Sequence, residues 1–260
     1  MKKIAFLVGL LLFIISAAFA GTGVKKRRPL PFEYGRVVID NYAKENHLAP
    51  AVFDHWLHRS MYTCRLCHVD IGFAMKANET GIRASDNEKG YYCGSCHNGK
   101  DAFSACKESF DREDFVICSL CHAEGENVPR SYDFREFVKG FPKGWLGNGV
   151  DWDKAEEQGK ISLVDYLEGI SIKRAKFVEP EDFELKSQVL SMPDIKFSHR
   201  KHTVWNGCEV CHPEIFVGIK KGMTKFSMAD LYEGKYCGVC HNSVAFPLLE
   251  CQRCHREKVQ

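Results

Sequence analysis

Twelve of the thirteen cysteines in this chain form pairs with two residues between them, and a histidine follows each pair directly. This arrangement could attach a haem, because each thiol can add to one vinyl group of the porphyrin while the histidine ligates the iron. The residues concerned are Cys64, Cys67 and His68; Cys93, Cys96 and His97; Cys118, Cys121 and His122; Cys208, Cys211 and His212; Cys237, Cys240 and His241; and Cys251, Cys254 and His255. The six motifs predict six covalently bound haem c groups.

Two other uses of paired cysteines explain less of the pattern. A redox-active dithiol needs the two cysteines but not the histidine that follows each pair. Zinc sites would combine neighbouring Cys-x-x-Cys units and would not need a histidine in every one. One such motif could arise by accident, but six motifs that use all but one cysteine could not. The pattern therefore favours haem.

The first twenty residues have the pattern of a secretory signal peptide. Lys2 and Lys3 precede an apolar run over residues 4–15, and Ala18-Phe19-Ala20 forms a small-x-small cleavage site. A single membrane anchor is the alternative, but the run is short for a span, and no cysteine follows the cleavage site to carry a lipid. We expect residues 1–20 to be removed and the mature chain to be periplasmic, with an extracellular or a cell-surface location as the alternatives. Such a location agrees with c-type haem, which is attached outside the cytoplasm.

The charge balance favours neither nucleic acid nor a membrane surface as a partner. The chain has 36 Lys and Arg against 34 Asp and Glu, and loss of Lys2 and Lys3 with the signal peptide leaves 34 of each. A neutral apoprotein lacks the basic footprint that nucleic-acid binding needs. The basic cluster over residues 25–28 is interpreted as a solvated tail.

An internal repeat divides the chain. The stretch FDHWLHRSMYTCRLCH, which begins at Phe53, matches FSHRKHTVWNGCEVCH, which begins 144 residues later at Phe197. The same shift superposes the second motif of each copy, whereas the third motifs lie 133 residues apart because the first copy carries the insertion CKESFDREDFV. We predict an N-terminal extension over residues 21–49, a trihaem unit over 50–125, a haem-free middle segment over 126–193 and a second trihaem unit over 194–260.

Five of the eleven histidines lie outside the six motifs. They are His47, His55, His58, His199 and His202. The last four form the repeated pair Phe-x-His-x-x-His. Histidines three residues apart can share one face of a helical turn, or point from an extended turn toward two different irons. Their recurrence at a fixed distance from the haem cysteines favours iron ligation over an ordinary core or surface role.

The pattern Phe-x-His-x-x-His ahead of three closely spaced Cys-x-x-Cys-His motifs resembles the trihaem cytochrome c7 family, a short relative of tetrahaem cytochrome c3. The resemblance covers both units, about half of the chain, and leaves out the middle segment. In that family the first histidine of the pair ligates the haem of the next motif, and the second ligates the haem of the motif after it. The resemblance implies these ligand pairs: His55 for the haem of Cys64/Cys67, His58 for Cys93/Cys96, His199 for Cys208/Cys211 and His202 for Cys237/Cys240.

The third haem of each unit departs from the family pattern. The family usually supplies it with a histidine four residues before the second motif, where this chain has Lys89 and Glu233. The haems of Cys118/Cys121 and Cys251/Cys254 therefore need another sixth ligand or stay open. Methionine is the leading substitute, because a thioether ligates haem iron and raises its potential. The predicted ligands are Met75 and Met228, with His47 and Met223 as competitors. Four haems would then be bis-histidine and two histidine/methionine.

The middle segment carries no haem motif. Gly147 and Gly149 predict a turn, and DWDKAEEQGK predicts a short helix that ends at Gly159. Its aromatic side chains either cover haem edges or form a small cluster of their own; they are Phe141, Trp145, Trp152 and Tyr166.

The thirteenth cysteine, Cys106, is predicted to be a buried free thiol, with an intermolecular disulfide as the alternative.

The expected fold class is a multihaem cytochrome c of short α-helices and ordered loops with little β-structure, built as two c7-like trihaem units. Haem must supply much of the buried apolar surface, so the chain should not fold without it. The leading function is electron transfer by hopping between haems, without catalytic residues. Its partners would be redox proteins such as a membrane quinol-oxidising complex or a terminal reductase. The alternatives are a reductase with an open haem site and a subunit of a conducting filament.

Overall fold

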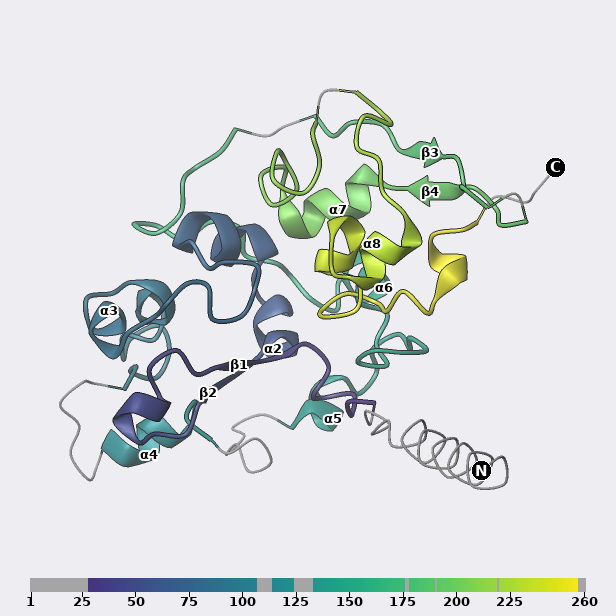
Figure 1. The fold of residues 1–260 in the computed structure, drawn as a ribbon. Helices are drawn as coiled ribbons and strands as arrows, with labels where there is room; N and C mark the ends of the chain where they lie inside the picture. The colour runs from purple at the N-terminus through teal and green to yellow at the C-terminus, as the bar shows by residue number, and fades with distance from the viewer. Residues whose placement is uncertain are drawn as a thin grey trace, which may run out of the picture.

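The computed structural model describes residues 28–106, 114–123, 133–175, 178–189, 191–218 and 220–256. Short elements gather in two groups, one from the first half of the described chain and one from the second half (Figure 1). The expected signal peptide lies outside the described residues. No helix among the described residues is long and apolar enough to span a membrane.

The first group, called unit 1 here, consists of helical turns joined by loops and one two-stranded sheet. Its elements are β1 (Arg36–Ile39), η1 (Lys44–Asn46), β2 (Ala51–Asp54), α2 (His55–Arg59), η2 (Leu66–Ile71), α3 (Ala84–Glu88), η3 (Tyr92–Ser95) and α4 (Asp114–Ser119). Helical turns coincide with the predicted haem motifs in this unit, as the sequence indicates.

The second group, unit 2, has the same plan, and two short helices lie between the groups. These two are α5 (Phe134–Phe137) and α6 (Trp152–Glu157); unit 2 has β3 (Phe183–Leu185), β4 (Ile195–Phe197), α7 (His199–Asn206), α8 (Met228–Tyr232), η4 (Tyr236–Val239) and η5 (Cys251–Arg253). The predicted class of short helices and loops with little sheet is confirmed. The helix predicted before Gly159 is α6, and Gly159 follows it with φ +65°.

Each unit opens with an antiparallel hairpin that the sequence analysis does not identify. β1 pairs with β2 so that Val37 faces Phe53, and β3 pairs with β4 so that Phe183 faces Phe197. Phe53 and Phe197 are equivalent in the sequence repeat. The repeated architecture therefore begins before the repeated sequence, and the end of the haem-free middle segment supplies the first strand of unit 2.

The second haem motif of each unit packs closely against the helix before it. A Cβ added at Gly94 would lie 1.9 Å from the carbonyl oxygen of Asn87, and one at Gly238 would lie 1.9 Å from that of Leu231. Only glycine allows this approach, because any side chain would collide with backbone. The glycine after the first cysteine thus holds η3 against α3, and η4 against α8.

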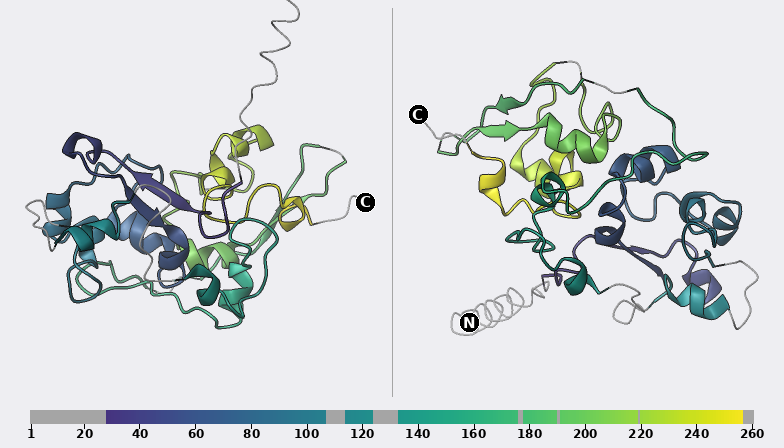
Figure 2. Two further views of the ribbon diagram at one scale, coloured as in Figure 1. Left: turned by 90° about the horizontal axis from the view of Figure 1, so that it is seen from below. Right: turned by 180° about the vertical axis from the view of Figure 1, so that it is seen from behind.

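The middle segment packs against both units and does not form an aromatic cluster of its own, while the covering of haem edges stays a prediction. Trp152 and Phe134 belong to one buried apolar cluster with Trp56 of unit 1 and Trp205 of unit 2. Trp145, by contrast, is 91% exposed and Tyr166 is 44% exposed. Views from below and behind show the segment running along both units (Figure 2). The aromatic residues expected to act together are therefore divided between a shared core and the surface.

Charged side chains reinforce this junction. Arg174 of the middle segment donates to Asp70 of unit 1 at 2.7 Å and to Glu209 of unit 2 at 2.5 Å. The Asp70 side chain is fully buried, and Arg174 pairs with its carboxylate there. Arg65, which is 4% exposed, pairs with Asp165 of the middle segment. The units are held together by apolar packing and by ion pairs that both involve the middle segment.

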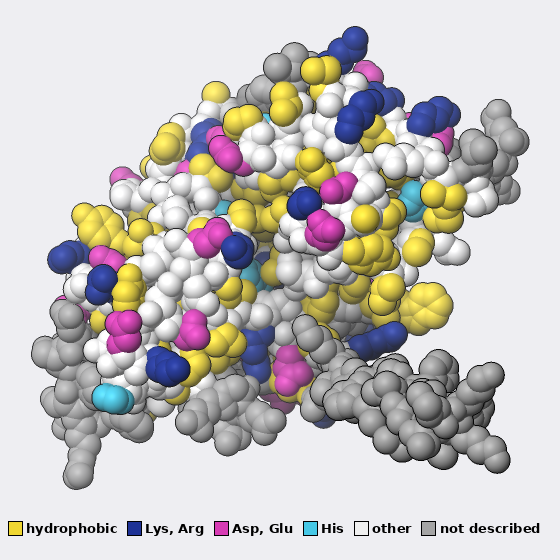
Figure 3. All heavy atoms as spheres, viewed as in Figure 1, with side chains coloured by type: hydrophobic (Ala, Val, Ile, Leu, Met, Phe, Trp, Pro, Cys, Tyr) yellow, Lys and Arg dark blue, Asp and Glu magenta, His cyan; other side chains and the backbone are white. Residues whose placement is uncertain are grey.

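The protein core is small for a chain of this length. Leu66 is the only large side chain among the described residues that is essentially fully buried. Apolar side chains are visible along the middle of the face in Figure 3, between the two units. A chain with so little interior of its own needs another source of buried apolar surface.

Candidate haem-binding sites

All six motif histidines are oriented by a hydrogen bond from Nδ1 to a backbone carbonyl. The acceptors are Phe73 O (2.9 Å, for His68), Phe103 O (3.0 Å, for His97), Ala49 O (2.7 Å, for His122), Phe216 O (2.7 Å, for His212), Phe246 O (3.0 Å, for His241) and Pro193 O (2.7 Å, for His255). A carbonyl can only accept, so Nδ1 carries the proton and Nε2 keeps its lone pair. This is the tautomer that a histidine needs to ligate a metal through Nε2.

Four of these acceptors are phenylalanines that the haem motif alone does not predict. Each follows its motif histidine by four to six residues, at Phe73, Phe103, Phe216 and Phe246. Two of the phenylalanine rings also lie against the histidine they orient, at 4.4 Å between centroids for His97 and 4.3 Å for His241. The spacing of histidine and phenylalanine is a sequence signal that could have identified them.

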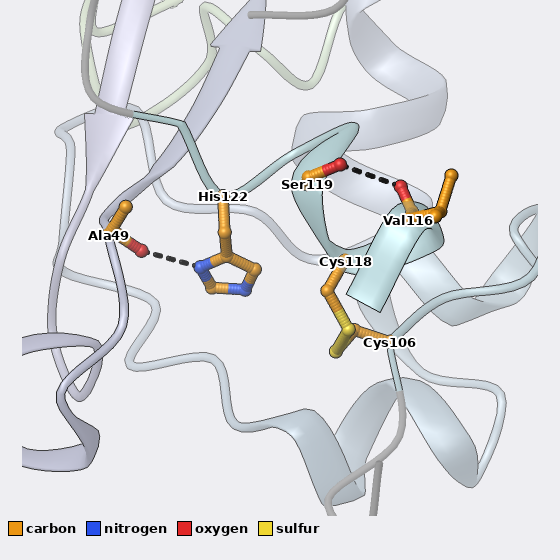
Figure 4. Close-up of a disulfide and its surroundings, with 6 residues drawn as sticks. All are labelled: Ala49, Cys106, Val116, Cys118, Ser119 and His122. Carbon is orange, nitrogen blue, oxygen red and sulfur yellow. Dashed lines mark hydrogen bonds between the residues drawn. A yellow bond between two sulfur atoms is a disulfide. The ribbon is translucent and has the colours of Figure 1, made fainter. Parts of the chain in front are cut away.

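The third motif of each unit uses a different acceptor, at the start of the unit. Val52 N donates to Cys121 O at 2.7 Å, and the equivalent Lys196 N donates to Cys254 O at 2.9 Å. These bonds bring the motif beside the chain that precedes β2 or β4, where Ala49 and Pro193 accept from His122 and His255. Figure 4 shows the His122 contact. The two third sites therefore share one backbone arrangement although their sequences do not align by the same shift.

The paired histidines outside the motifs stand at the start of α2 and α7. His55 and His58 are the first and fourth residues of α2, and His199 and His202 hold the same places in α7. Residues three apart lie on one helix face, so each turn presents two rings on the same side. The hairpin orients the first ring of each pair: His55 Nδ1 donates to Gly35 O at 2.6 Å, and His199 Nδ1 donates to Glu181 O at 3.0 Å.

The second histidines differ in their own hydrogen bonds. His202 Nδ1 donates to Ser198 O at 2.7 Å, four residues earlier in the chain. His58 Nδ1 is buried and has no partner within hydrogen-bonding geometry among the described residues, although the backbone of Asp54 is near enough to raise its pKa.

Three of these histidines face a motif histidine across a gap of constant width. The ring centroids are 6.4 Å apart for His55 and His68, 6.3 Å for His58 and His97, and 6.2 Å for His202 and His241. Two imidazoles that bind one metal from opposite sides, at nitrogen–metal bonds of about 2.0–2.1 Å, have centroids about 6.3 Å apart. The residues present therefore fit a bis-histidine iron at these three positions.

Burial keeps these rings uncharged. It lowers the pKa of His55, His58 and His241 to about 4 in each case, and it also lowers the pKa of His202. At neutral pH the rings are neutral, which is the form that ligates a metal.

Burial also raises the pKa of several motif thiols. The pKa is raised to about 12 for Cys67, Cys237 and Cys240, and to about 11 for Cys93 and Cys211. These thiols are uncharged at neutral pH and lie in apolar surroundings. Such surroundings suit side chains that join the edge of a porphyrin.

The other predicted histidine ligands do not lie opposite a motif histidine at this distance. Among the described residues, no imidazole ring faces His122, His212 or His255 at a comparable distance. His199 is half-buried, and His47 is exposed on the turn after η1. The ligation of the Cys208/Cys211 haem by His199 stays a prediction.

The methionines predicted for the third haems lie partly exposed. Met75 is 41% exposed and Met228, the first residue of α8, is 40% exposed, while the competitor Met223 is 57% exposed. Lys89 and Glu233, which replace the expected family histidine, are the equivalent C-caps of α3 and α8. Ligation by methionine also stays a prediction.

The prediction that Cys106 is a buried free thiol is wrong. Cys106 is half-buried and forms a disulfide with Cys118, the first cysteine of the third motif (Figure 4). The insertion that carries Cys106 brings its Cα to 4.9 Å from that of Cys118, within the range that a disulfide spans. One sulfur cannot hold both this bond and a thioether. Cys118 can therefore attach haem only in chains in which the disulfide is open.

Comparison with known proteins identifies one family, which matches two regions of the chain. The family described as "Cytochrome c7 and related cytochrome c" matches residues 51–123 and again residues 195–257. No curated protein matches the chain.

Solved multihaem structures are also similar. The C-terminal hexahaem fragment of GSU1996 shares 27% identity over 85% of this chain and 97% of that fragment, with a TM-score of 0.27. A c7-type three-haem cytochrome domain shares 36% identity over 30% of this chain and 95% of that domain, with a TM-score of 0.28. The dodecahaem cytochrome c GSU1996 shares 24% identity over 80% of this chain and 70% of that one, with a TM-score of 0.27. The overall superpositions are loose, and the family assignment rests on the two sequence matches.

Proposed function

Because the chain belongs to the family of cytochrome c7 and related cytochromes c, we propose that it is an exported hexahaem cytochrome that passes electrons between redox proteins by hopping from haem to haem. Membership of a multihaem family accounts for haem c and for an electron-carrier role in general. The count of six, the export and the hopping path are the specific parts of the proposal.

Haem, when bound, supplies a reversible one-electron couple at iron. The chain's own residues do the rest. The motif cysteines fix each porphyrin edge, and the motif histidines approach with Nε2 unprotonated. His55, His58 and His202 would each hold a haem iron through a second nitrogen, which would leave no coordination position for a substrate at those three sites. Ligand sets that stay the same in both oxidation states need little rearrangement, which favours rapid electron transfer.

The observation that carries the proposal is the common 6.2–6.4 Å separation of the three facing histidine pairs. These pairs join residues that lie 13 to 39 positions apart in the sequence. Three histidine pairs, from two helices, reach the spacing of a doubly ligated iron, and packing of histidines against one another would not select one distance.

The partners are proposed to be redox proteins, such as a membrane quinol-oxidising complex as donor or a terminal reductase as acceptor. Each haem adds two propionates, so the loaded protein is more acidic than its neutral sequence. Weak electrostatic docking to a basic partner surface would then set the rate of encounter. A periplasmic or cell-surface location would give access to both kinds of partner.

The experiment is to produce the full chain in a host that attaches c-type haem, and to measure its intact mass and its haem content. The expected result is a chain that lacks residues 1–20 and carries six haems. Near-infrared magnetic circular dichroism of the oxidised protein would identify the ligands, with bis-histidine signals expected for four haems. A mass that corresponds to three haems or fewer would contradict the proposal.

A reductase with an open haem site is the second candidate function. It is favoured by His122 and His255, which have no facing imidazole ring among the described residues. Carbon monoxide binding to the native reduced protein distinguishes the two. One or two equivalents bound without loss of structure would favour an open site, and no binding would favour a pure electron carrier.

A further inference from the structure

Arg59, the last residue of α2, lies where four parts of the chain meet. Its guanidinium stacks at 4.9 Å over Trp152 of the middle segment and at 4.9 Å over Trp205 of unit 2. Its Nη1 donates to the carbonyl of Val244, also in unit 2, at 2.5 Å. Tyr34, from the N-terminal extension, donates to the next carbonyl, that of Ala245, at 2.6 Å. The arginine is therefore held in one position from several sides.

No carboxylate side chain among the described residues pairs with this arginine. Among the described residues it forms no ion pair, and its Nε is buried without a hydrogen-bond acceptor. The titratable groups that act on it are the thiols of Cys64 and Cys240 and the phenol of Tyr34. In the loaded protein both sulfurs are thioethers without charge, and burial raises the pKa of Tyr34 to about 12, so none of these groups is negative at neutral pH. An arginine keeps its proton even when buried, so a fixed positive charge remains.

A buried cation without a counter-ion destabilises a protein unless something offsets its desolvation. Two tryptophan faces and one carbonyl offset part of that cost. A purely structural role would be served as well by an apolar side chain. The equivalent residue of unit 2 is Thr203, which donates its hydroxyl to Glu179 at 3.0 Å and lies at the surface. The cation is thus a feature of the junction and not of the repeated ligand framework.

The position of Arg59 relates it to two haem sites at once. Cys64 attaches the first haem of unit 1, and Cys240 attaches the second haem of unit 2. Val244, whose carbonyl accepts from Arg59, donates its own N–H to the carbonyl of Cys240 at 3.0 Å. Cys64 packs against the apolar cluster that contains Trp152 and Trp205, the two rings over which Arg59 stacks. The attachment edges of these two sites therefore meet around one charge, although the sites lie 173–176 residues apart in the sequence.

We propose that Arg59 is a potential-setting residue shared by the haem sites of Cys64/Cys67 and Cys237/Cys240, and that these two sites form the electron-transfer junction between the units. Reduction adds one electron to a haem, and a nearby fixed positive charge stabilises the reduced state. Arg59 raises the reduction potential of both sites together. The inference rests on the proposed function, because it requires haem at both sites.

The experiment is a potentiometric titration in which each haem is followed by its own NMR signals, on the wild type and on Arg59→Gln and Arg59→Met. Removal of the charge should lower the equilibrium constant for reduction by roughly tenfold at each of the two junction haems and much less at the other four. Arg59→Lys should retain most of the wild-type potentials, because it keeps a positive charge on a stem of similar length.

Arg200→Gln is the matched control, because it removes one positive charge from an exposed ion pair with Glu157. It should leave the junction haems unchanged. Arg59→Met replaces the buried cation by an apolar side chain of similar size, a change that proteins often tolerate, so it should load haem even if Arg59→Gln does not.

Haem content is measured first, so that loss of the proposed function is separated from loss of the inference. Six haems with unchanged junction potentials in Arg59→Met would overturn the role of Arg59. A shift confined to other haems would do the same. Six haems with the paired shift would establish it.

Discussion

Unit 1 and unit 2 carry their paired histidines at the same positions of α2 and α7, yet the surroundings of these histidines differ. The hairpin carbonyls of Gly35 and Glu181 orient the first histidine of α2 and of α7. In both units the histidine of the third motif donates a hydrogen bond to a backbone carbonyl at the start of the unit. Beyond this framework, and among the residues that the structure describes, only unit 1 has a disulfide at its third site and a buried cation after its second paired histidine.

The difference shows which features a repeated haem unit must keep and which can vary. Contacts that orient ligands involve backbone carbonyls, so they survive when the side chains of the acceptor residues change, as from Ala49 to Pro193. Contacts that modify a site involve side chains. Arg59 of unit 1, for example, is replaced by Thr203 at the equivalent position of unit 2, and Cys106 belongs to an insertion found in unit 1. Two units of one design can thus have sites of different chemistry.

The largest expected effect comes from removing equivalent ligands. His58→Ala and His202→Ala should each convert one low-spin haem to a form that binds one equivalent of carbon monoxide, because their rings face the motif histidine at 6.3 and 6.2 Å. Visible and EPR spectra measure the change. If only one of the two variants loses a low-spin haem, the units do not share their ligand framework.

A large effect on stability is expected where the units differ in packing. Trp205 is 8% exposed, and the equivalent residue of unit 1, Met61, is 39% exposed. Trp205→Ala should lower the free energy of unfolding by about 3–5 kcal/mol, because it opens a cavity in the shared core. Met61→Ala should change it by about 0.5 kcal/mol or less. Guanidinium denaturation of the loaded proteins would check both values, and equal losses would contradict a core centred on the junction.

The ion pairs that join the units should contribute less. Arg174→Ala leaves the buried carboxylate of Asp70 without a partner and should cost about 1–3 kcal/mol. Lys186→Ala removes the exposed ion pair with Asp194 within unit 2 and should have no measurable effect. Denaturant midpoints at low and high salt would compare them. A cost that disappears in high salt would place the Arg174 contact at the surface.

The smallest effect concerns one haem in one unit. Cys106→Ser removes the partner that competes for Cys118, so a larger fraction of chains should carry six haems when attachment takes place under oxidising conditions. The loaded variant should be as stable as the wild type. Intact mass spectrometry counts the haems, and the peptide that contains Cys118 would identify the affected site. An unchanged distribution would mean that the disulfide does not compete with attachment.

Sequence patterns predicted the parts of the site that are local. The six motifs, the paired histidines and the helix before Gly159 follow from residue types at fixed short spacings, and the family resemblance is confirmed. The phenylalanines whose carbonyls orient the motif histidines could also have been predicted from the sequence, since each lies four to six residues after a motif histidine.

The rest depends on contacts between distant segments. β1 and β3 have unrelated sequences, because a hairpin partner needs only to supply backbone groups. Cys106 was interpreted as free because every other cysteine belongs to a haem motif, and only the structure shows that it reaches Cys118. The role of the middle segment could not be predicted from the sequence because Trp152 packs against residues of both units. These residues lie far from Trp152 in the sequence, so no local pattern indicates the contacts.

The histidine of the third motif links the end of each unit to its start by a hydrogen bond. His122 and His255 depend on carbonyls that lie 73 and 62 residues earlier, at Ala49 and Pro193, whereas the other four depend on carbonyls a few residues later. A recombinant fragment that begins at the first motif cysteine would retain every thiol and every motif histidine, but would leave the last imidazole free to rotate. Removing residues at the start of a unit should therefore first disturb the third haem site, which is the site farthest along the chain from the deletion.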